Sequence, residues 1–287
     1  MKKTIRVAKL LIRKKLKLLR KLLSPEVQIR HIVLSVGQAC NLSCIECGAL
    51  TPYAPKEIMR YEMEAIIKDL ELFIKNGFVF RRIQIQGGEP LLYKRLPELL
   101  KWLYESKKFE NIRIATNGTL IPGDEILTAL KSYNVQMRIS DYHIEENKAV
   151  IPELINILET HAVRYYYYSF KSGESLWYAK GGLEMEREAD DATVKKRFQT
   201  CKNNTCLTLE NAKLCWCTRA INAPLIQGFD AKGGDFLRVA DSRALRYKIL
   251  MYLEKKRFME ACRYCRGTDE AYLVPPAEQM RQEVRDG

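Results

Sequence analysis

Short apolar runs alternate with amphipathic segments between residues 30 and 170. The apolar runs are rich in β-branched and aromatic residues and predict strands, and the segments between them have helical spacing and predict helices. The strands are expected at 30–36, 81–86, 111–116, 135–140 and 163–170, and the helices near 61–75, 94–107, 124–133 and 147–159. Such an alternation predicts an α/β fold, with a parallel sheet and helices outside it.

The alternation ends at Lys171, where a polar and irregular stretch, "SGESLWYAKGGLEMEREADD", begins. The later segment "CLTLENAKLCWC" predicts a two-stranded hairpin that turns near Glu210 and Asn211, and a helix is expected near residues 244–254. We therefore expect a basic amphipathic helix over 1–24, a core domain over 25–170 and a smaller domain over 171–287.

The net charge of +13 comes mostly from the first segment, because residues 1–23 hold ten Lys or Arg and no acidic residue. This segment predicts an amphipathic helix in the interface of an anionic membrane. A solvated helix packed on the body or on a partner, or a nucleic-acid-binding arm, are the alternatives; nucleic acid is not expected, since no further basic patch with aromatic residues follows. The apolar face consists of Ile5, Ala8, Ile12, Leu16, Leu19 and Leu23.

Neither a membrane span nor a secretory signal is expected, because lysine and arginine interrupt the apolar positions of the N-terminal segment. The nine cysteines are clustered, which favours metal ligation in a reducing cytoplasm over disulfides. The expected location is cytoplasmic, and the predicted N-terminal helix indicates peripheral attachment to the inner face of the membrane.

The stretch "CNLSCIEC" places Cys40, Cys44 and Cys47 in one loop directly after a predicted strand. Tetrahedral zinc and four-iron clusters normally take four protein ligands, so three cysteines indicate either a distant fourth ligand or a position left open. The loops "GGEP", "TNGT" and "SDYH" also follow predicted strands. Because parallel strands end at a common edge of the sheet, we expect these loops to form one site.

The loop "CNLSCIEC", followed by "GGEP" at the end of the second strand, resembles the radical S-adenosylmethionine (SAM) enzymes. The resemblance implies a partial (β/α)6 barrel in which Cys40, Cys44 and Cys47 hold three irons of a 4Fe–4S cluster, and SAM binds the fourth iron. It also implies that residues 87–89 meet the amino end of SAM. By the same analogy Asn117 and Ser140 face its ribose or carboxylate, and the SAM-binding residues are Gly87, Gly88, Glu89, Asn117 and Ser140. The family often has an aromatic residue where this chain has Glu46, so the usual adenine contact is in doubt.

The second region resembles the auxiliary-cluster domains called SPASM and twitch domains. This resemblance implies one auxiliary 4Fe–4S cluster held by Cys201, Cys217, Cys262 and Cys265, with Ala212 where glycine is usual. A structural zinc site on the same four thiolates is the alternative. Cys206 and Cys215 are expected to be small buried apolar side chains, and the choice between Cys215 and Cys217 as ligand stays open.

Similar small twitch enzymes oxidise a secondary alcohol, so the resemblance implies oxidation of a sugar or cyclitol hydroxyl by a radical SAM oxidoreductase. His143 or Asp141 are the candidates for a general base, with substrate binding or helix capping as the simpler roles. The expected partners are a small-molecule or lipid-linked saccharide and an electron donor such as flavodoxin or ferredoxin. The alternatives are a radical epimerase in which Cys206 or Cys215 returns a hydrogen atom, a peptide-modifying enzyme, and a zinc-stabilised membrane adaptor.

Overall fold

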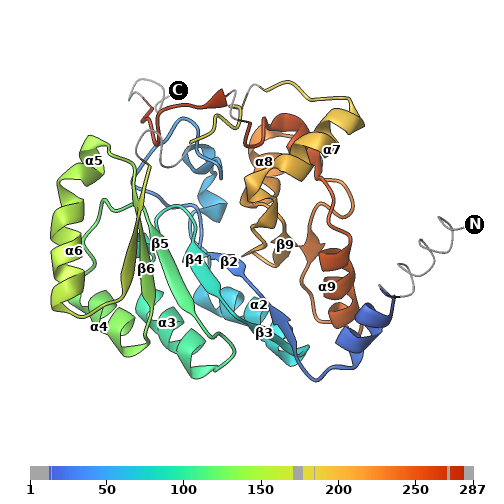
Figure 1. Ribbon diagram of the computed structural model, residues 1–287, viewed down its shortest axis with the longest axis horizontal. Helices are drawn as coiled ribbons and strands as arrows, with labels where there is room; N and C mark the ends of the chain where they lie inside the picture. The colour runs from blue at the N-terminus through green and yellow to red at the C-terminus, as the bar shows by residue number, and fades with distance from the viewer. Residues whose placement is uncertain (1–12, 14, 171–176, 184, 270–271, 281–287) are drawn as a thin grey trace, which may run out of the picture.

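A mixed sheet forms the centre of the computed structural model, which describes residues 13, 15–170, 177–183, 185–269 and 272–280 (Figure 1). Its eight strands lie in the order β10-β9-β8-β2-β4-β5-β6-β7, and the six from β8 to β7 are parallel. The strands are β2 (Ile32–Ser35), β4 (Ile83–Gln86), β5 (Ile112–Thr116), β6 (Gln136–Asp141), β7 (Tyr165–Ser169), β8 (Thr208–Glu210), β9 (Lys213–Cys215) and β10 (Leu237–Arg238). The predicted α/β class with a parallel sheet is confirmed.

Helices connect the parallel strands, and most of them lie where the apolar spacing predicts them. Figure 1 shows α4, α5 and α6 along the side of the sheet near β6, and α7, α8 and α9 gathered near β9. The helices are α2 (Met63–Lys75), α3 (Leu96–Glu105), α4 (Asp124–Ser132), α5 (Glu145–Lys148), α6 (Val150–Thr160), α7 (Asp191–Thr200), α8 (Thr218–Gln227) and α9 (Leu245–Glu254). Short 3-10 turns lie at Thr51–Tyr53, Lys56–Ile58, Pro90–Leu92, Lys202–Thr205 and Glu260–Tyr264, and β1 (Val27–Ile29) pairs with β3 (Phe78–Phe80).

The two faces of the parallel strands differ in polarity. On one face, apolar side chains such as Ile85, Ile114 and Ile139 are fully buried in the main core together with residues of the helices. The positions between them are polar, and Gln84, Arg113, Arg138 and Ser140 fall on the opposite face by the alternation of side chains along a strand. The inner face of the sheet is therefore suited to a polar ligand.

The predicted hairpin is present as β8 and β9, and Asn211 and Ala212 at its turn both have positive φ, at 46° and 57°. Its first strand does not form a separate sheet, because β8 pairs in parallel with β2 of the core. Asp69 on α2 also accepts a hydrogen bond from the Ala212 backbone N–H at 2.6 Å. The main sheet thus continues past residue 171, and the division into domains over 25–170 and 171–287 stays a prediction.

Residues 15–23 are helical, as the amphipathic pattern predicts. Leu18 and Leu22 pack against the main core, whereas Leu16, Leu19 and Leu23 are 49%, 50% and 76% exposed. These three belong to the predicted apolar face, whose other members, Ile5, Ala8 and Ile12, lie outside the described residues. Within the described part of the chain, no helix has the length and apolar character that crossing a membrane requires.

Candidate functional site

The three cysteines of the first loop lie together at the edge where β2 ends. Cys44 is buried with Leu42 and Ala277, and Cys40 and Cys47 pack against the same cluster of side chains. Burial raises the pKa of Cys40 to about 11 and that of Cys44 to about 12. Thiols are metal ligands in their ionised form, so a bound cation would be needed to hold these side chains as thiolates at neutral pH.

Gly87 and Gly88 let the loop after β4 lie directly on the backbone that leads into the cysteine loop. The N–H of Gly88 donates to the carbonyl of Gly37 at 3.0 Å, and the N–H of Glu89 donates to the carbonyl of Ala39 at 2.8 Å. A Cβ on Gly87 would lie 2.0 Å from the oxygen of Gly37, and one on Gly88 would lie 2.2 Å from the oxygen of Ala39. We expected these glycines to admit a ligand, and the close approach found here is to the chain's own backbone.

Glu89 and Asn117 connect the glycine loop with the loop after β5. The Glu89 carboxylate accepts hydrogen bonds from the backbone N–H of Asn117 at 2.7 Å and of Leu91 at 3.1 Å. Burial raises the pKa of Glu89 to about 7, and these hydrogen bonds oppose the rise. The Asn117 amide points at Cys40, with its nitrogen 3.8 Å from the sulfur. The structure thus brings the predicted residues Glu89 and Asn117 to the first cysteine.

Ser140 is buried near the end of β6, where its carbonyl accepts a hydrogen bond from the side chain of Asn147 at 3.4 Å. It lies at the same edge of the sheet as Asn117, whose carbonyl accepts from the same Asn147 amide at 3.3 Å. The five residues predicted to bind SAM therefore lie on loops and strand ends at one edge of the sheet.

A segment far along the chain covers the cysteine loop. The N–H of Ile45 donates to the carbonyl of Glu278, and the N–H of Met280 donates to the carbonyl of Ser43. The Gln279 side chain accepts from the N–H of Ser43 at 2.7 Å and donates to the sulfur of Cys44 at 3.4 Å. Sequence reasoning missed Gln279, because nothing near it in the chain marks it as a partner of a cysteine 235 positions away.

A second group of cysteines surrounds a small cavity of about 40 Å³ between α7, α8 and the 3-10 turn at Glu260–Tyr264. A single water needs roughly 10–15 Å³, so side chains leave this space unfilled. Cys206 and Cys215 do not line it, and Cys215 is fully buried with its thiol donating to the carbonyl of Cys217. The cysteines that line the cavity are Cys201, Cys217, Cys262 and Cys265.

Arg219 also lines this cavity and is only 3% exposed. One of its guanidinium nitrogens, Nη2, donates to the carbonyl of Gly181 at 2.6 Å, but Nε and Nη1 are buried without a partner among the described residues. A buried cation is costly unless an anion or several acceptors face it. The set of four thiols and one uncompensated guanidinium therefore fits a group with net negative charge, such as a thiolate-bound iron–sulfur cluster.

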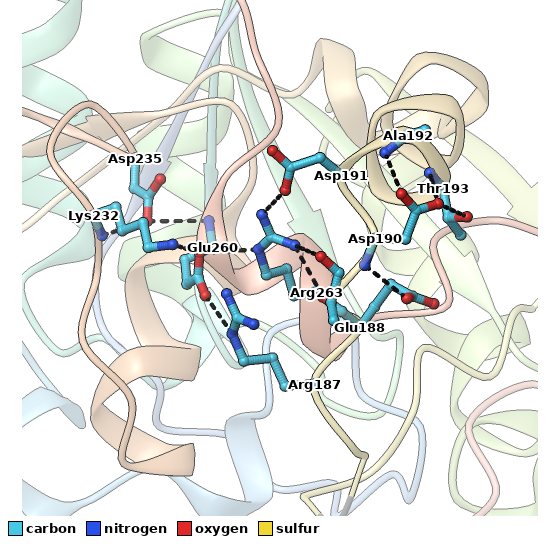
Figure 2. Close-up of polar contacts among 11 residues, drawn as sticks. Arg187, Glu188, Asp190, Asp191, Ala192, Thr193, Lys232, Asp235, Glu260 and Arg263 are labelled. Atoms are coloured by element: carbon cyan, nitrogen blue, oxygen red, sulfur yellow. Dashed lines mark hydrogen bonds and ion pairs between the residues drawn. The ribbon is translucent and has the colours of Figure 1, made fainter.

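The turn that carries Cys262 is held by a network of charged side chains (Figure 2). Figure 2 shows the Glu260 carboxylate between Arg187, Lys232 and Arg263, with Arg187 at 2.8 Å, Lys232 at 3.1 Å and Arg263 at 3.2 Å. Arg263 also contacts the carboxylate of Asp191. The network thus joins the start of α7 to the 3-10 turn at Glu260–Tyr264, which carries Cys262.

Asp141 and His143 lie beside β7, on the face of the sheet away from Arg138. The Nδ1 atom of His143 lies 3.2 Å from the Asp141 carboxylate, and its Nε2 lies 2.8 Å from the hydroxyl of Ser169. Asp141 is three positions from Arg138 on β6, so strand alternation turns the two side chains to opposite faces. Asp141 and His143 therefore lie on the side of the sheet away from the polar inner face, and their role as a general base stays a prediction.

The chain matches the model of the Radical SAM superfamily over residues 34–144. This range includes the first cysteine loop and the loops that carry Glu89 and Asn117. The chain carries a radical SAM domain. The resemblance that the sequence indicates is thereby confirmed, while the auxiliary-cluster region stays a prediction.

Known relatives match part of the chain. GTP 3',8-cyclase of Petrotoga mobilis is 35% identical over 97 residues, which are 33% of this chain and 29% of that protein. GTP 3',8-cyclase of Campylobacter jejuni strain RM1221 is 32% identical over 123 residues, which are 40% and 37% of the two chains. The chain thus spans about a third of the length of these curated relatives.

One solved structure is similar over most of the chain. The crystal structure of BtrN in complex with AdoMet and 2-DOIA has a TM-score of 0.54 and 17% sequence identity, and the match covers 89% of this chain and 98% of BtrN. At this identity the likeness shows the fold. It extends beyond the radical SAM domain into the region that carries the second group of cysteines.

Radical SAM domains use a 4Fe–4S cluster and SAM, so the prediction of these two cofactors is confirmed at the level of the family. The residues present fit such a cluster, because three neighbouring thiols leave one iron without a protein ligand. Among the residues that the structure describes, no three Cys, His, Asp or Glu side chains are arranged to hold a single metal ion.

Replacing Gly88 with alanine is expected to destabilise the radical SAM domain by about 1–3 kcal/mol, because the new Cβ meets rigid backbone rather than a flexible side chain. Urea unfolding of the purified protein measures this loss. The matched control is Gly233→Ala, since a Cβ on Gly233 meets nothing within 4 Å. Equal unfolding midpoints for the two variants would contradict the close approach described for Gly88.

Replacing Gln279 with leucine is expected to lower the reduction potential of the first cluster. A hydrogen bond to a ligand sulfur stabilises the more negative, reduced form, and a net worth of roughly 0.5–1.5 kcal/mol corresponds to about 20–60 mV for one electron. A redox titration followed by electron paramagnetic resonance measures the change. Gln199→Leu, on the exposed side of α7, is the control, and a potential equal to that of wild type in Gln279→Leu would rule out the contact.

Proposed function

We propose that this protein is a radical SAM oxidoreductase that oxidises a secondary alcohol of a sugar or cyclitol. The observation that carries the proposal is the second cavity, where Cys201, Cys217, Cys262 and Cys265 surround a space that Arg219 also lines, with its Nε and Nη1 buried and without a partner among the described residues. Oxidation of an alcohol to a carbonyl removes two electrons. One leaves with the hydrogen atom that a radical abstracts, and a second iron–sulfur cluster at this place would accept the other.

In this proposal the first site holds the radical-generating group. Cys40, Cys44 and Cys47 would bind the first cluster, and the loops of residues 87–89, Asn117 and Ser140 would bind SAM. When bound, these groups supply a 5'-deoxyadenosyl radical that takes a hydrogen atom from a substrate C–H bond. The chain's own task is to fix the cysteine loop, which Gly88, Glu89 and Asn117 do through the hydrogen bonds described above.

The second site fits the twitch-like arrangement with one auxiliary 4Fe–4S cluster. Its lining combines the four thiols with apolar side chains such as Phe198 and Met259 and with the polar side chains of Arg197, Arg219, Asn203 and Asn204. Burial raises the pKa of Cys217 to about 12. Burial also strengthens the interaction of the Arg219 cation with a bound anionic group. Cys217 rather than Cys215 is the ligand that we propose, because Cys215 lies outside the cavity.

Oxidation of an alcohol also releases the proton of its hydroxyl. Glu46, which lines a large cavity beside the cysteine loop, is the acceptor that we favour. The sequence predicts Asp141 or His143 as the general base, but neither of them lines that cavity. Glu46 stands where the family often has an aromatic residue, so its carboxylate replaces a common adenine contact with a group that can hold a proton.

The location is part of the same proposal. The exposed side chains of Leu16, Leu19 and Leu23 belong to a helix with many lysines and arginines. Such a helix would bind a membrane surface and bring the enzyme to a saccharide carried on a membrane lipid. We propose peripheral binding to an anionic membrane surface, with flavodoxin or ferredoxin as electron donor. The relatives named GTP 3',8-cyclase match about a third of their own length, so a cyclase activity is not transferred to this chain.

The proposal is tested by the metal content and by the product. Replacing Cys201, Cys217, Cys262 and Cys265 with alanine should lower the iron content of the reconstituted protein from about eight to about four per chain. Cys206→Ala and Cys215→Ala are the matched controls and should keep about eight. Mass spectrometry on a panel of neutral and phosphorylated saccharides and cyclitols should give a product lighter by a pair of hydrogen atoms. A product of unchanged mass would mean epimerisation, and zinc in place of iron would remove the electron acceptor.

A further inference from the structure

A cavity of about 470 Å³ lies between the cysteine loop and the second group of cysteines. Glu46 and Gly48 of the cysteine loop form one part of its lining, and Lys202 and Asn203, next to Cys201, form another. A cavity of this size accommodates a ligand of several rings. A substrate bound here would lie between the two cysteine sites that the proposed reaction uses.

Two cations of this lining have no carboxylate partner in the part of the chain that the structure describes. Arg138 lies on the inner face of β6, where its guanidinium carbon is 4.6 Å from the centre of the Tyr168 ring. Lys180 is only 8% exposed, and its ammonium group donates to the carbonyl of Gly267 at 3.0 Å. The ammonium group also lies 5.2 Å from the centre of the Tyr178 ring, and neither of these contacts is with an anion.

Basic side chains outnumber carboxylates among the residues that line the cavity. Lys202 also lines it and donates to the hydroxyl of Tyr178 at 2.6 Å, whereas Glu46 is the one carboxylate among the lining residues. The positive charges of Lys180 and Arg138 also reach the thiol of Cys206, where they oppose the increase in pKa that burial causes. The two cations therefore act on a common region beside the cavity, and a negatively charged ligand group would compensate them.

The lining also has an aromatic part, which includes the Tyr168 ring next to Arg138. Phe170 and Trp177 contact each other with ring centres 5.5 Å apart, and Tyr168 packs against Phe170 with ring centres 5.0 Å apart. All three line the cavity. Aromatic walls with a few placed polar groups are typical of sites for small organic ligands, which here would combine an apolar ring face with an anionic substituent.

We propose that the substrate is a phosphorylated saccharide, such as a sugar phosphate or a sugar diphosphate ester, whose phosphoryl group binds Arg138 and Lys180 while its ring packs against the aromatic wall. The inference rests on the proposed function and specifies the substrate class of that site. A phosphoryl group presents several acceptor oxygens and up to a double negative charge, and arginine binds it through its planar fork of donors. A neutral sugar would leave both cations uncompensated.

The test measures binding rather than turnover. Isothermal titration calorimetry is carried out anaerobically on the reconstituted protein saturated with SAM, with glucose 1-phosphate, inorganic phosphate, glucose and acetate as separate probes. Glucose 1-phosphate is expected to bind at least about tenfold more tightly than glucose or acetate, and Arg138→Gln to weaken it by about tenfold or more. Lys180→Gln is a second variant with the same expectation.

Arg113→Gln is the matched control, because Arg113 lies on the inner face of the neighbouring strand, hydrogen bonds to Gln136 and Tyr166, and does not line the cavity. It should bind glucose 1-phosphate as wild type does. Because Lys180 is buried, each variant is first checked for a wild-type melting temperature, and Arg138→Gln decides the question if Lys180→Gln fails to fold.

Equal binding of glucose 1-phosphate and glucose, or wild-type binding in Arg138→Gln, would overturn the proposal. Tighter binding of acetate than of phosphate would overturn it in favour of a carboxylate substrate. The phosphate titration is repeated on protein without SAM, and binding that occurs only without SAM would assign the cavity to SAM itself. Iron content and product mass test the proposed oxidation separately, so a failure of the anion site is distinguishable from a failure of the proposed function.

Discussion

Replacing Cys40, Cys44 and Cys47 with alanine is expected to abolish cleavage of SAM and to lower the iron content of the anaerobically reconstituted protein from about eight to about four per chain. The three side chains belong to one cluster, in which Cys44 is buried and Cys40 and Cys47 are partly buried, and no other cysteine of the described residues packs there. SAM cleavage depends on this cluster, so the expected effect on activity is complete loss rather than a reduction.

Iron and sulfide analysis, together with formation of 5'-deoxyadenosine after chemical reduction, measures both parts of this prediction. The variant that lacks Cys201, Cys217, Cys262 and Cys265 is the matched control, because it should lose about as much iron while it still cleaves SAM. A fall from about four irons to none in the triple variant would mean a single cluster, and alcohol oxidation would then lack its electron acceptor.

Replacing Glu260 with alanine is expected to destabilise the protein by about 3–5 kcal/mol, which is the usual cost of removing one member of a buried charge network. Both Glu260 and Arg263 have side chains that are 6% exposed, so the loss of the carboxylate leaves a buried guanidinium with less compensation. Burial alone would raise the pKa of Glu260, but its hydrogen bonds from Lys232 and Arg187 lower it, so the carboxylate is ionised at neutral pH.

Denaturant unfolding at neutral pH measures the free energy of unfolding of this variant. Asp241→Asn is the control, because the ion pair between Asp241 and Lys75 is exposed and is expected to contribute at most about 1 kcal/mol. If Glu260→Ala unfolds at the same denaturant concentration as Asp241→Asn, the network of Figure 2 does not stabilise the turn that carries Cys262.

Local patterns predict the strands and helices of the first half of the chain well, because each helix there has one apolar stripe against the sheet. Among the later helices, α9 lies where a helix is predicted, but α7 and α8 lack this signal. Residues Asp191–Thr200 of α7 bury only Val194 and Phe198, and α8 contains Pro224 in its interior, so neither segment resembles an amphipathic helix in its sequence. Their positions depend on contacts with the second group of cysteines, which sequence spacing does not encode.

Part of the candidate site can likewise be predicted from local sequence patterns, and part cannot. Motif spacing identifies the first cysteine loop, Glu89 and Asn117, because each follows a strand directly. Which of Cys215 and Cys217 reaches the second cavity depends on where β9 ends, and Cys217 is free to turn inward because it lies beyond the strand. The sequence also indicates on which face of β6 each side chain lies: Asp141 and Arg138 are three positions apart, so they fall on opposite faces of the sheet.

The hydrogen bonds between the cysteine loop and residues 278–280 also bear on the order in which the protein is assembled. A ribosome makes Cys44 long before Gln279, which lies 235 positions later, and domains generally begin to fold from the N-terminal side during synthesis. The loop therefore emerges without the segment that closes over it, and its thiols are open to the machinery that inserts iron and sulfide until the last contacts form. Residues 278–280 are also made after Cys265, the last cysteine of the second site. The order of synthesis therefore favours insertion of a cluster at the first site before residues 278–280 cover it.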